Sequence, residues 1–80
     1  MKITMISTSN ATQTFDANWA ELETATGNMV IQANHIPTIV TLTPHQPIVL
    51  ALKSGTQETI MTSGGIAHVE RTGITFILND

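Results

Sequence analysis

Short runs in which apolar and polar residues alternate constrain the fold of this chain more than any other feature. Ile and Thr are the commonest residues in these runs, and their branched Cβ atoms, like that of Val, favour a pleated, half-buried strand over a helix. Eight such runs, separated by turn residues, cover 2–7, 14–24, 29–32, 38–42, 47–53, 58–62, 66–70 and 74–78. Because they leave no space for a helix of ordinary length, the chain is predicted to be one all-β domain over residues 1–80.

The same alternation divides each strand into two faces. Ile74, Phe76 and Leu78 fall on one side of the last run, which predicts that they belong to the core. In the second run Trp19 falls opposite Leu22, on a more polar face, so we expect it to be partly exposed. Two packed sheets of short, mostly antiparallel strands can each hide one apolar face, and the predicted architecture is therefore a β-sandwich.

Glycine and proline mark where the runs end. Gly55 and Gly73 each follow a small polar residue between two runs, a pattern typical of a hairpin turn with positive φ. Gly64 and Gly65 lie next to a run without an ordinary turn sequence, which predicts a β-bulge or a close backbone approach. A central strand cannot run through the segment 44–47, Pro-His-Gln-Pro, because neither proline has an N–H to donate.

Composition excludes several classes of protein. Hydrophobic residues make up 41% of the chain and charged residues 11%, with a net charge of −3, so the chain can fold but has no basic footprint for nucleic acid. Cysteine is absent, which excludes disulfides, thiolate zinc sites and thiol nucleophiles. No apolar run approaches the roughly 18 to 20 residues that span a bilayer, and none suits a signal peptide. The expectation is a cytoplasmic protein without direct membrane insertion.

His35 is the most tempting candidate for chemistry, because it lies in a loop and can titrate near neutral pH. Catalysis would need partners, and the sequence holds no G-x-S-x-G motif, no flanking pair of carboxylates and no second histidine at metal-ligand spacing. The alternative is a loop histidine whose ring nitrogens bond backbone groups, in a loop that Pro37 stiffens by holding Ile36 extended. A small hydrolase centred on His35 remains the weaker alternative, and no cofactor, metal or small-molecule substrate is expected.

Two segments, GNMVIQANHIPTIVTLTP and LKSGTQETIMTSGGIAHVERTGITFIL, together resemble the N-terminal β-sandwich domain of the epsilon subunit of F-type ATP synthase, the delta subunit of mitochondria. The family pattern has a Gly, an apolar strand, a Gly-His or Asn-His step, Pro and a Leu-x-Pro turn, followed by a Gly hairpin and a Ser-Gly-Gly-aliphatic step. The residues that fit these places are Gly27, Met29, Ile31, Asn34, His35, Pro37, Leu42, Pro44, Gly55, Ser63, Gly64, Gly65, Ile66 and Val69.

The resemblance implies two roughly five-stranded sheets, about ten short strands in all, in a non-catalytic subunit of the central rotor stalk. In the family this domain binds the gamma subunit and rests on the c-ring, so that ion-driven rotation is coupled to ATP synthesis, and it lies peripherally on the cytoplasmic side of the membrane. By resemblance Asn28, Asn34 and His35 form the c-ring docking loop, while Gly27, Pro37, Gly64 and Gly65 supply structural turns and a bulge.

Three departures from the family pattern qualify these expectations. Many bacterial relatives have an acidic residue at the place of Asn28, and TPHQPI stands where a Lys-Pro-Gly turn is usual. The typical member also continues into a C-terminal helical hairpin that these 80 residues do not include, so inhibition and ATP sensing are not expected of them. The alternative to a rotor subunit is a free-standing β-sandwich that binds other proteins, because fold does not determine function.

Overall fold

The computed structural model describes all 80 residues and consists of strands and their connections. The strands are β1 (Lys2–Ile6), β2 (Gln13–Thr24), β3 (Gly27–Gln32), β4 (Thr38–Leu42), β5 (Gln46–Leu52), β6 (Gln57–Thr62), β7 (Gly65–Glu70) and β8 (Gly73–Leu78). All eight predicted runs are present, and each boundary lies within two residues of its predicted place. The structure contains no helix with the length and apolar character needed to cross a membrane.

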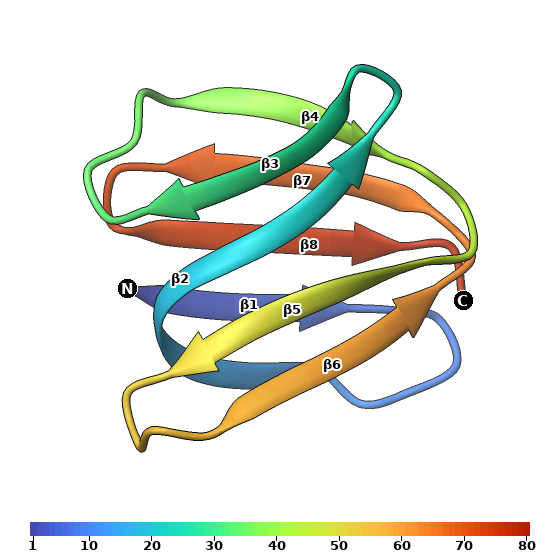
Figure 1. Cartoon of the computed structure of the whole chain (residues 1–80). Helices are drawn as coiled ribbons and strands as arrows, with labels where there is room; N and C mark the ends of the chain where they lie inside the picture. Colours follow the sequence, from blue (N-terminus) through green and yellow to red (C-terminus); the bar gives the residue numbers. More distant parts are fainter.

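The strands form two layers that share β2 (Figure 1). In the front layer, β3, the second half of β2, β5 and β6 lie side by side in that order, whereas the back layer consists of β4, β7, β8, β1 and the first half of β2. All pairs are antiparallel except β1 with β8. The predicted sandwich is confirmed, but the count of about ten strands is wrong: there are eight, because one long strand serves both layers.

The transfer of β2 from one layer to the other occurs near Asn18. The first residues of β2 pair with β1, and after a register shift between Ala17 and Trp19 the strand continues against β5. A bulge of this kind increases the local bend and twist of a strand. The hydrogen-bonded network is therefore continuous through the bend, and the two layers are not separate sheets.

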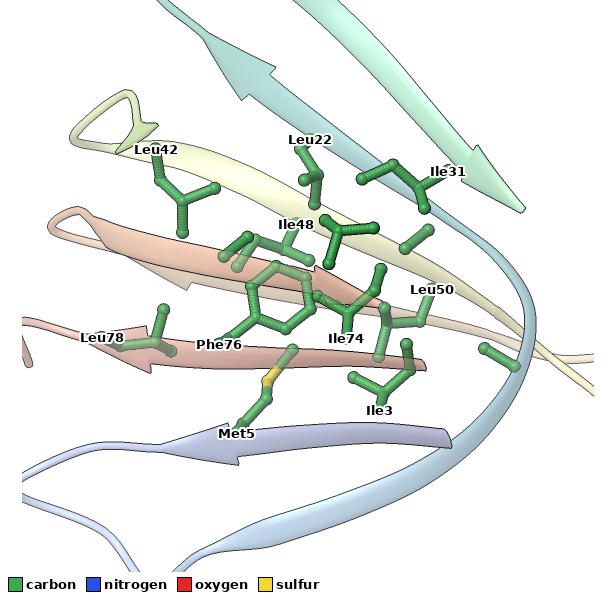
Figure 2. Close-up of a cluster of buried hydrophobic side chains, with 14 residues drawn as sticks. Ile3, Met5, Leu22, Ile31, Leu42, Ile48, Leu50, Ile74, Phe76 and Leu78 are labelled. Carbon is green, nitrogen blue, oxygen red and sulfur yellow. The ribbon is translucent and has the colours of Figure 1, made fainter. Parts of the chain in front are cut away.

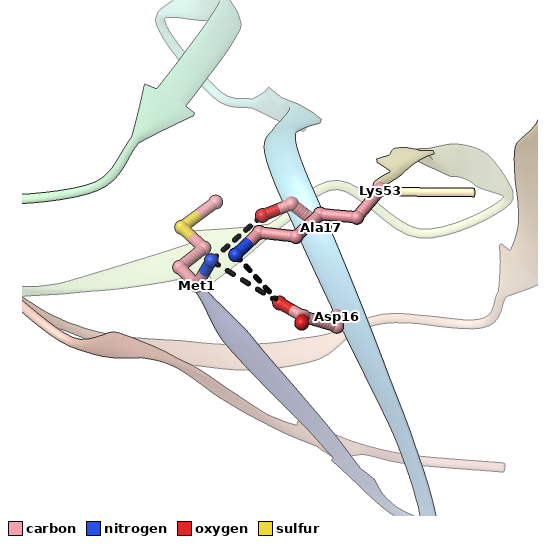
Figure 3. Close-up of polar contacts among 4 residues, drawn as sticks. All are labelled: Met1, Asp16, Ala17 and Lys53. Atoms are coloured by element: carbon pink, nitrogen blue, oxygen red, sulfur yellow. Dashed lines mark hydrogen bonds and ion pairs between the residues drawn. The ribbon is translucent and has the colours of Figure 1, made fainter. Parts of the chain in front are cut away.

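Polar contacts hold the bend on its outer side (Figure 3). The Met1 ammonium group donates to the Ala17 carbonyl oxygen at 2.7 Å and lies 3.5 Å from Asp16 Oδ1. The Lys53 Nζ atom is 3.6 Å from the same Asp16 oxygen, and the Lys53 N–H donates to the Asp16 carbonyl at 3.0 Å. Asp16 thus links the start of β1, the bend of β2 and the end of β5.

The core is one cluster between the layers (Figure 2). Its largest member, Phe76, is fully buried at the centre, and it lies near Ile48 of the front layer and Met5 of the back layer. The predicted core faces are confirmed, since Ile74, Phe76 and Leu78 are all buried. The cluster comprises Ile3, Met5, Ala17, Ala20, Leu22, Ile31, Leu42, Ile48, Leu50, Ala67, Val69, Ile74, Phe76 and Leu78.

The glycines act as the sequence predicted, with one exception. Gly55 has a φ of 96° in the β5–β6 hairpin. Gly73 has no positive φ, because Arg71 and Thr72 form the β7–β8 turn. Gly73 is the first residue of β8 and pairs with Glu70, the last residue of β7. Its role is a close approach, because a Cβ atom there would lie 2.1 Å from the backbone oxygen of Lys2. The prediction of a hairpin was correct, but the physical reason given for Gly73 was wrong.

Candidate docking surfaces

Hydrogen bonds tie the β3–β4 loop to the β7–β8 turn and link His35 to the residue that follows it. Asn34 has a φ of 67°, its N–H donates to the Arg71 carbonyl at 2.8 Å, and the Arg71 Nη1 atom donates to the Asn34 carbonyl at 3.3 Å. The Nδ1 atom of His35 lies 2.8 Å from the Ile36 carbonyl oxygen. Because a carbonyl oxygen can only accept, Nδ1 is the donor. His35 is thus a loop histidine bonded to the backbone, as one of the two sequence interpretations predicted.

The surroundings of His35 do not support catalysis. None of the three ion pairs in the structure includes His35. None of the three surface hollows includes it among the lining residues, and no group of three or more His, Asp or Glu side chains is arranged to hold a metal ion. A histidine without an adjacent acid, nucleophile or pocket lacks the geometry that general acid–base chemistry requires.

Asn28 lies at the opposite end of β3 from His35. Its Nδ2 atom donates to Glu23 Oε1 across the β2–β3 hairpin at 2.9 Å, and Gly27 beside it has a φ of 121°. The six residues of β3 span roughly 20 Å. The structure therefore brings Asn34 and His35 together but separates both from Asn28, so the three residues do not form one loop, as the resemblance had implied. They mark the two ends of an edge strand instead (Figure 1).

A polar cluster that the sequence reasoning missed joins the end of β8 to the β6–β7 connection. One Asp80 side-chain oxygen accepts the Ser63 N–H at 3.1 Å and lies 3.0 Å from the hydroxyls of Ser63 and Thr62. The Ser63 N–H and then the two hydroxyls stabilise the carboxylate and hold the pKa of Asp80 below its ordinary value of about 3.8. The Asp80 carbonyl accepts from Ser9. No short sequence motif predicts this cluster, because Asp80 is 17 residues from Ser63 in the sequence.

Gly64 and Gly65 lie where the same connection enters β7. Both glycines have positive φ, at 117° and 143°, and a Cβ atom on Gly65 would lie 2.1 Å from the Ile77 carbonyl oxygen. The Thr62 hydroxyl, which is buried, accepts the Gly64 N–H at 3.1 Å. Of the two predicted alternatives, a β-bulge or a close backbone approach, the structure shows the close approach, and the pairing of β7 with β4 and β8 is regular from Gly65 onward.

Each layer also has an outer face with exposed apolar side chains. On the back layer, pairing places Ile66 of β7 beside Ile77 of β8, and Ile77 beside Ile6 of β1, so that three exposed isoleucines form a row. On the front layer Trp19 is half-buried, as predicted, and Val30 and Met61 are exposed. Alternation predicted which side chains point outward, but only the register shows that they are neighbours.

Taken together, these features define a small β-sandwich with hydrogen-bonded loops and exposed apolar side chains on its outer sheet faces. The chain belongs to the family described as ATP synthase, Delta/Epsilon chain, beta-sandwich domain, which matches residues 1–80.

Solved structures with the same fold come from mitochondrial ATP synthases. One is the OSCP/F1/c-ring part of the Euglena gracilis enzyme, with a TM-score of 0.82 and 20% identity over 98% of this chain and 49% of that one. Another is the central stalk and c-ring of the Tetrahymena thermophila enzyme, with a TM-score of 0.80 and 16% identity over 99% of this chain and 63% of that one. The chain thus spans about half the length of the first of these chains and less than two thirds of the second. A comparison with curated proteins found no match.

Proposed function

We propose that this chain is a non-catalytic domain of the central rotor stalk of an F-type ATP synthase, where it binds the gamma subunit and the c-ring. The observation that carries the proposal is the family match over all 80 residues. Support comes from the two matched complexes, which are described as containing the c-ring, and from the absence of any arrangement around His35 suited to catalysis. The domain would lie peripherally, on the cytoplasmic side of the membrane.

The β3 edge is the part of the molecule best suited to the ring. β3 pairs only with β2, so the backbone groups on its other side are free to bond a partner. Asn28 at one end of this edge and Asn34 with His35 at the other present amide and imidazole groups that can bond polar loops. Because Arg71 and Pro37 fix the loop, contact under load would cost little conformational entropy.

Affinity for the gamma subunit tests the stalk assignment. The chain, co-expressed with the gamma subunit of the same ATP synthase, is expected to copurify with it as a stable complex. A folded monomer that binds neither gamma nor the c-ring would contradict the proposal and would instead identify a free-standing binding module.

Cysteine cross-linking tests the orientation, because the natural chain contains no cysteine that would give background. Asn28→Cys and His35→Cys are expected to cross-link to cysteines in the polar loops of the c-ring within the assembled enzyme. Thr59→Cys is the matched control, because it lies on β6 at the other edge of the front layer. Cross-linking from Thr59→Cys alone would show that the β3 edge faces away from the ring.

A further inference from the structure

The outer face of the front layer is apolar and uncovered. Trp19 pairs with Ala51 across β2 and β5, and Pro47 pairs with Met61 across β5 and β6. Val30 and Met61 are exposed to 50% and 59% of their surface, while Trp19 is half-buried. This face is turned toward the viewer in Figure 1, and no loop of the chain crosses it. We call it the Trp19 face.

Two carboxylates lie within this face and have no cation beside them. Glu21 and Glu23 follow Trp19 on the same side of β2, and Glu21 is flanked in register by Val30 of β3 and Val49 of β5. Both glutamates are half-buried, and neither takes part in an ion pair. Their only recorded partner is Asn28, which donates to Glu23.

None of the three fixed cations of the chain pairs with these glutamates. Lys53 is engaged with Asp16 at the end of β5. Lys2 is in β1 and Arg71 is in the β7–β8 turn, and both belong to the back layer. The Trp19 face is therefore an apolar surface with an uncompensated negative charge, and a basic partner would complement it.

The spacing along β2 specifies the shape of that partner. Successive residues on one side of a strand are about 6.8 Å apart, and residues four apart in an α-helix are separated by about 6 Å along its axis. A helix laid along β2 can therefore place three side chains of one face over Trp19, Glu21 and Glu23 in turn. Basic groups suit the two glutamates, and a tryptophan ring accepts either an apolar side chain or an arginine.

We propose that the Trp19 face docks a basic amphipathic helix, with Arg or Lys residues four positions apart pairing with Glu21 and Glu23. This deepens the proposed function and rests on it, because the helix would belong to the stalk partner. The isoleucine row on the back layer specifies no occupant: Lys2 and Glu70, which have opposite charges, lie on the same side of that layer.

A synthetic helix of defined sequence tests the chemistry directly. The probe is a blocked helical peptide of Ala and Leu that carries Leu-x-x-x-Arg-x-x-x-Arg on one face, and its control has the second arginine moved to the opposite face. Trp19, the only tryptophan, reports binding by a shift of its emission to the blue. The matched peptide is expected to bind, and the control peptide roughly tenfold more weakly.

Variants of the face complete the test. Glu21→Gln together with Glu23→Gln is expected to weaken binding of the matched peptide roughly tenfold, while Glu70→Gln on the back layer leaves it unchanged. Glu21→Lys with Glu23→Lys is expected to prefer a peptide whose arginines are replaced by glutamates. Equal binding of both peptides, or no loss in the Gln variant, would overturn the inference.

The gamma subunit provides the second arm and separates the two proposals. A roughly tenfold loss of gamma affinity in the Glu21→Gln, Glu23→Gln variant would support the Trp19 face as the gamma site. Gamma binding that is normal in this variant would overturn the inference and leave the proposed function standing. If the gamma subunit does not bind at all but the matched peptide binds through the two glutamates, the proposed function is wrong. The inference that the Trp19 face binds a basic amphipathic helix would then still hold.

Discussion

Gly65 begins β7 with a φ of 143° and lets the backbone of β8 come close. A Cβ atom there would lie 2.1 Å from the Ile77 carbonyl oxygen and 2.9 Å from the Leu78 Cα atom. Gly55 shares the positive φ, at 96°, but a Cβ atom there meets nothing within 4 Å. A substitution at Gly55 therefore costs backbone strain alone, whereas one at Gly65 costs backbone strain and steric overlap.

Alanine at these two positions is expected to have different effects. Gly55→Ala should lower the free energy of unfolding by about 1–2 kcal/mol through backbone strain. Gly65→Ala adds a backbone clash and is expected to cost at least about 3 kcal/mol, or to prevent folding. Urea unfolding followed by circular dichroism measures both, and equal losses would show that the clash at Gly65 is relieved by a small shift of β8.

Asp80 makes stability depend on pH at the level of a single carboxylate. Because its pKa is lowered in the folded state, its contribution is fully present above its ordinary value of about 3.8 and is lost as the pH falls through the lowered folded value. Asp80→Asn is expected to flatten the acid side of the stability profile, measured by urea unfolding from pH 7 to about pH 2. An unchanged profile would mean that other carboxylates account for the acid sensitivity.

At the scale of the element, β8 shows how alternation becomes packing. Its residues Ile74, Phe76 and Leu78 are buried, whereas Ile77 between them is 46% exposed. β8 lies between β1 and β7, so its inward side chains reach the centre of the core. The strand is thus the main contribution of the back layer to the packing seen in Figure 2.

Truncating the central side chain of β8 should remove a large part of the domain's stability. Phe76→Ala is expected to cost about 3–5 kcal/mol, because it leaves a cavity between the layers. A domain of 80 residues has about 4–12 kcal/mol in total. Ile77→Thr, one position along and exposed, is the control and is expected to change stability by less than about 0.5 kcal/mol. Thermal melts compare the two, and similar losses would contradict the assigned faces.

At the scale of the whole molecule, β2 makes the two layers one unit. It pairs with β1 at its start and with β3 and β5 after the bend, and a single bridge from Thr24 to Leu42 connects it to β4. The front layer therefore cannot separate from the back layer without breaking the bend. This shared strand also gives the Trp19 face and the β3 edge a fixed relative position.

Unfolding is accordingly expected to be a single cooperative transition. Backbone amides in β2 on both sides of the bend should exchange with solvent only through global unfolding, with equal free energies. Native-state hydrogen exchange by NMR measures this property. If the front-layer amides exchanged through a separate opening of lower energy, the two layers would be independent units.

Many residues of the candidate docking surfaces could be predicted from the sequence, but their arrangement in space could not. The bond of the His35 ring to the backbone could be predicted, as one of two interpretations, because both partners lie within the loop itself. The distance between Asn28 and His35 could not, since it depends on β3 running straight between two turns. The Asp80 cluster was missed for the same reason: Ser63 and Asp80 are distant in sequence, and their contact depends on where β6 and β8 end.

The sequence alone determined the eight strands, their inward faces, the close backbone approach at Gly65 and, by resemblance, the family. These features depend on neighbouring residues, on period-two alternation and on the backbone limits of glycine and proline, all of which are local. Only the tertiary structure decided that one strand serves both layers, that three isoleucines form a row and that Glu21 lies between two valines without a cation. Those facts depend on strand order and register, which arise from packing across the whole chain.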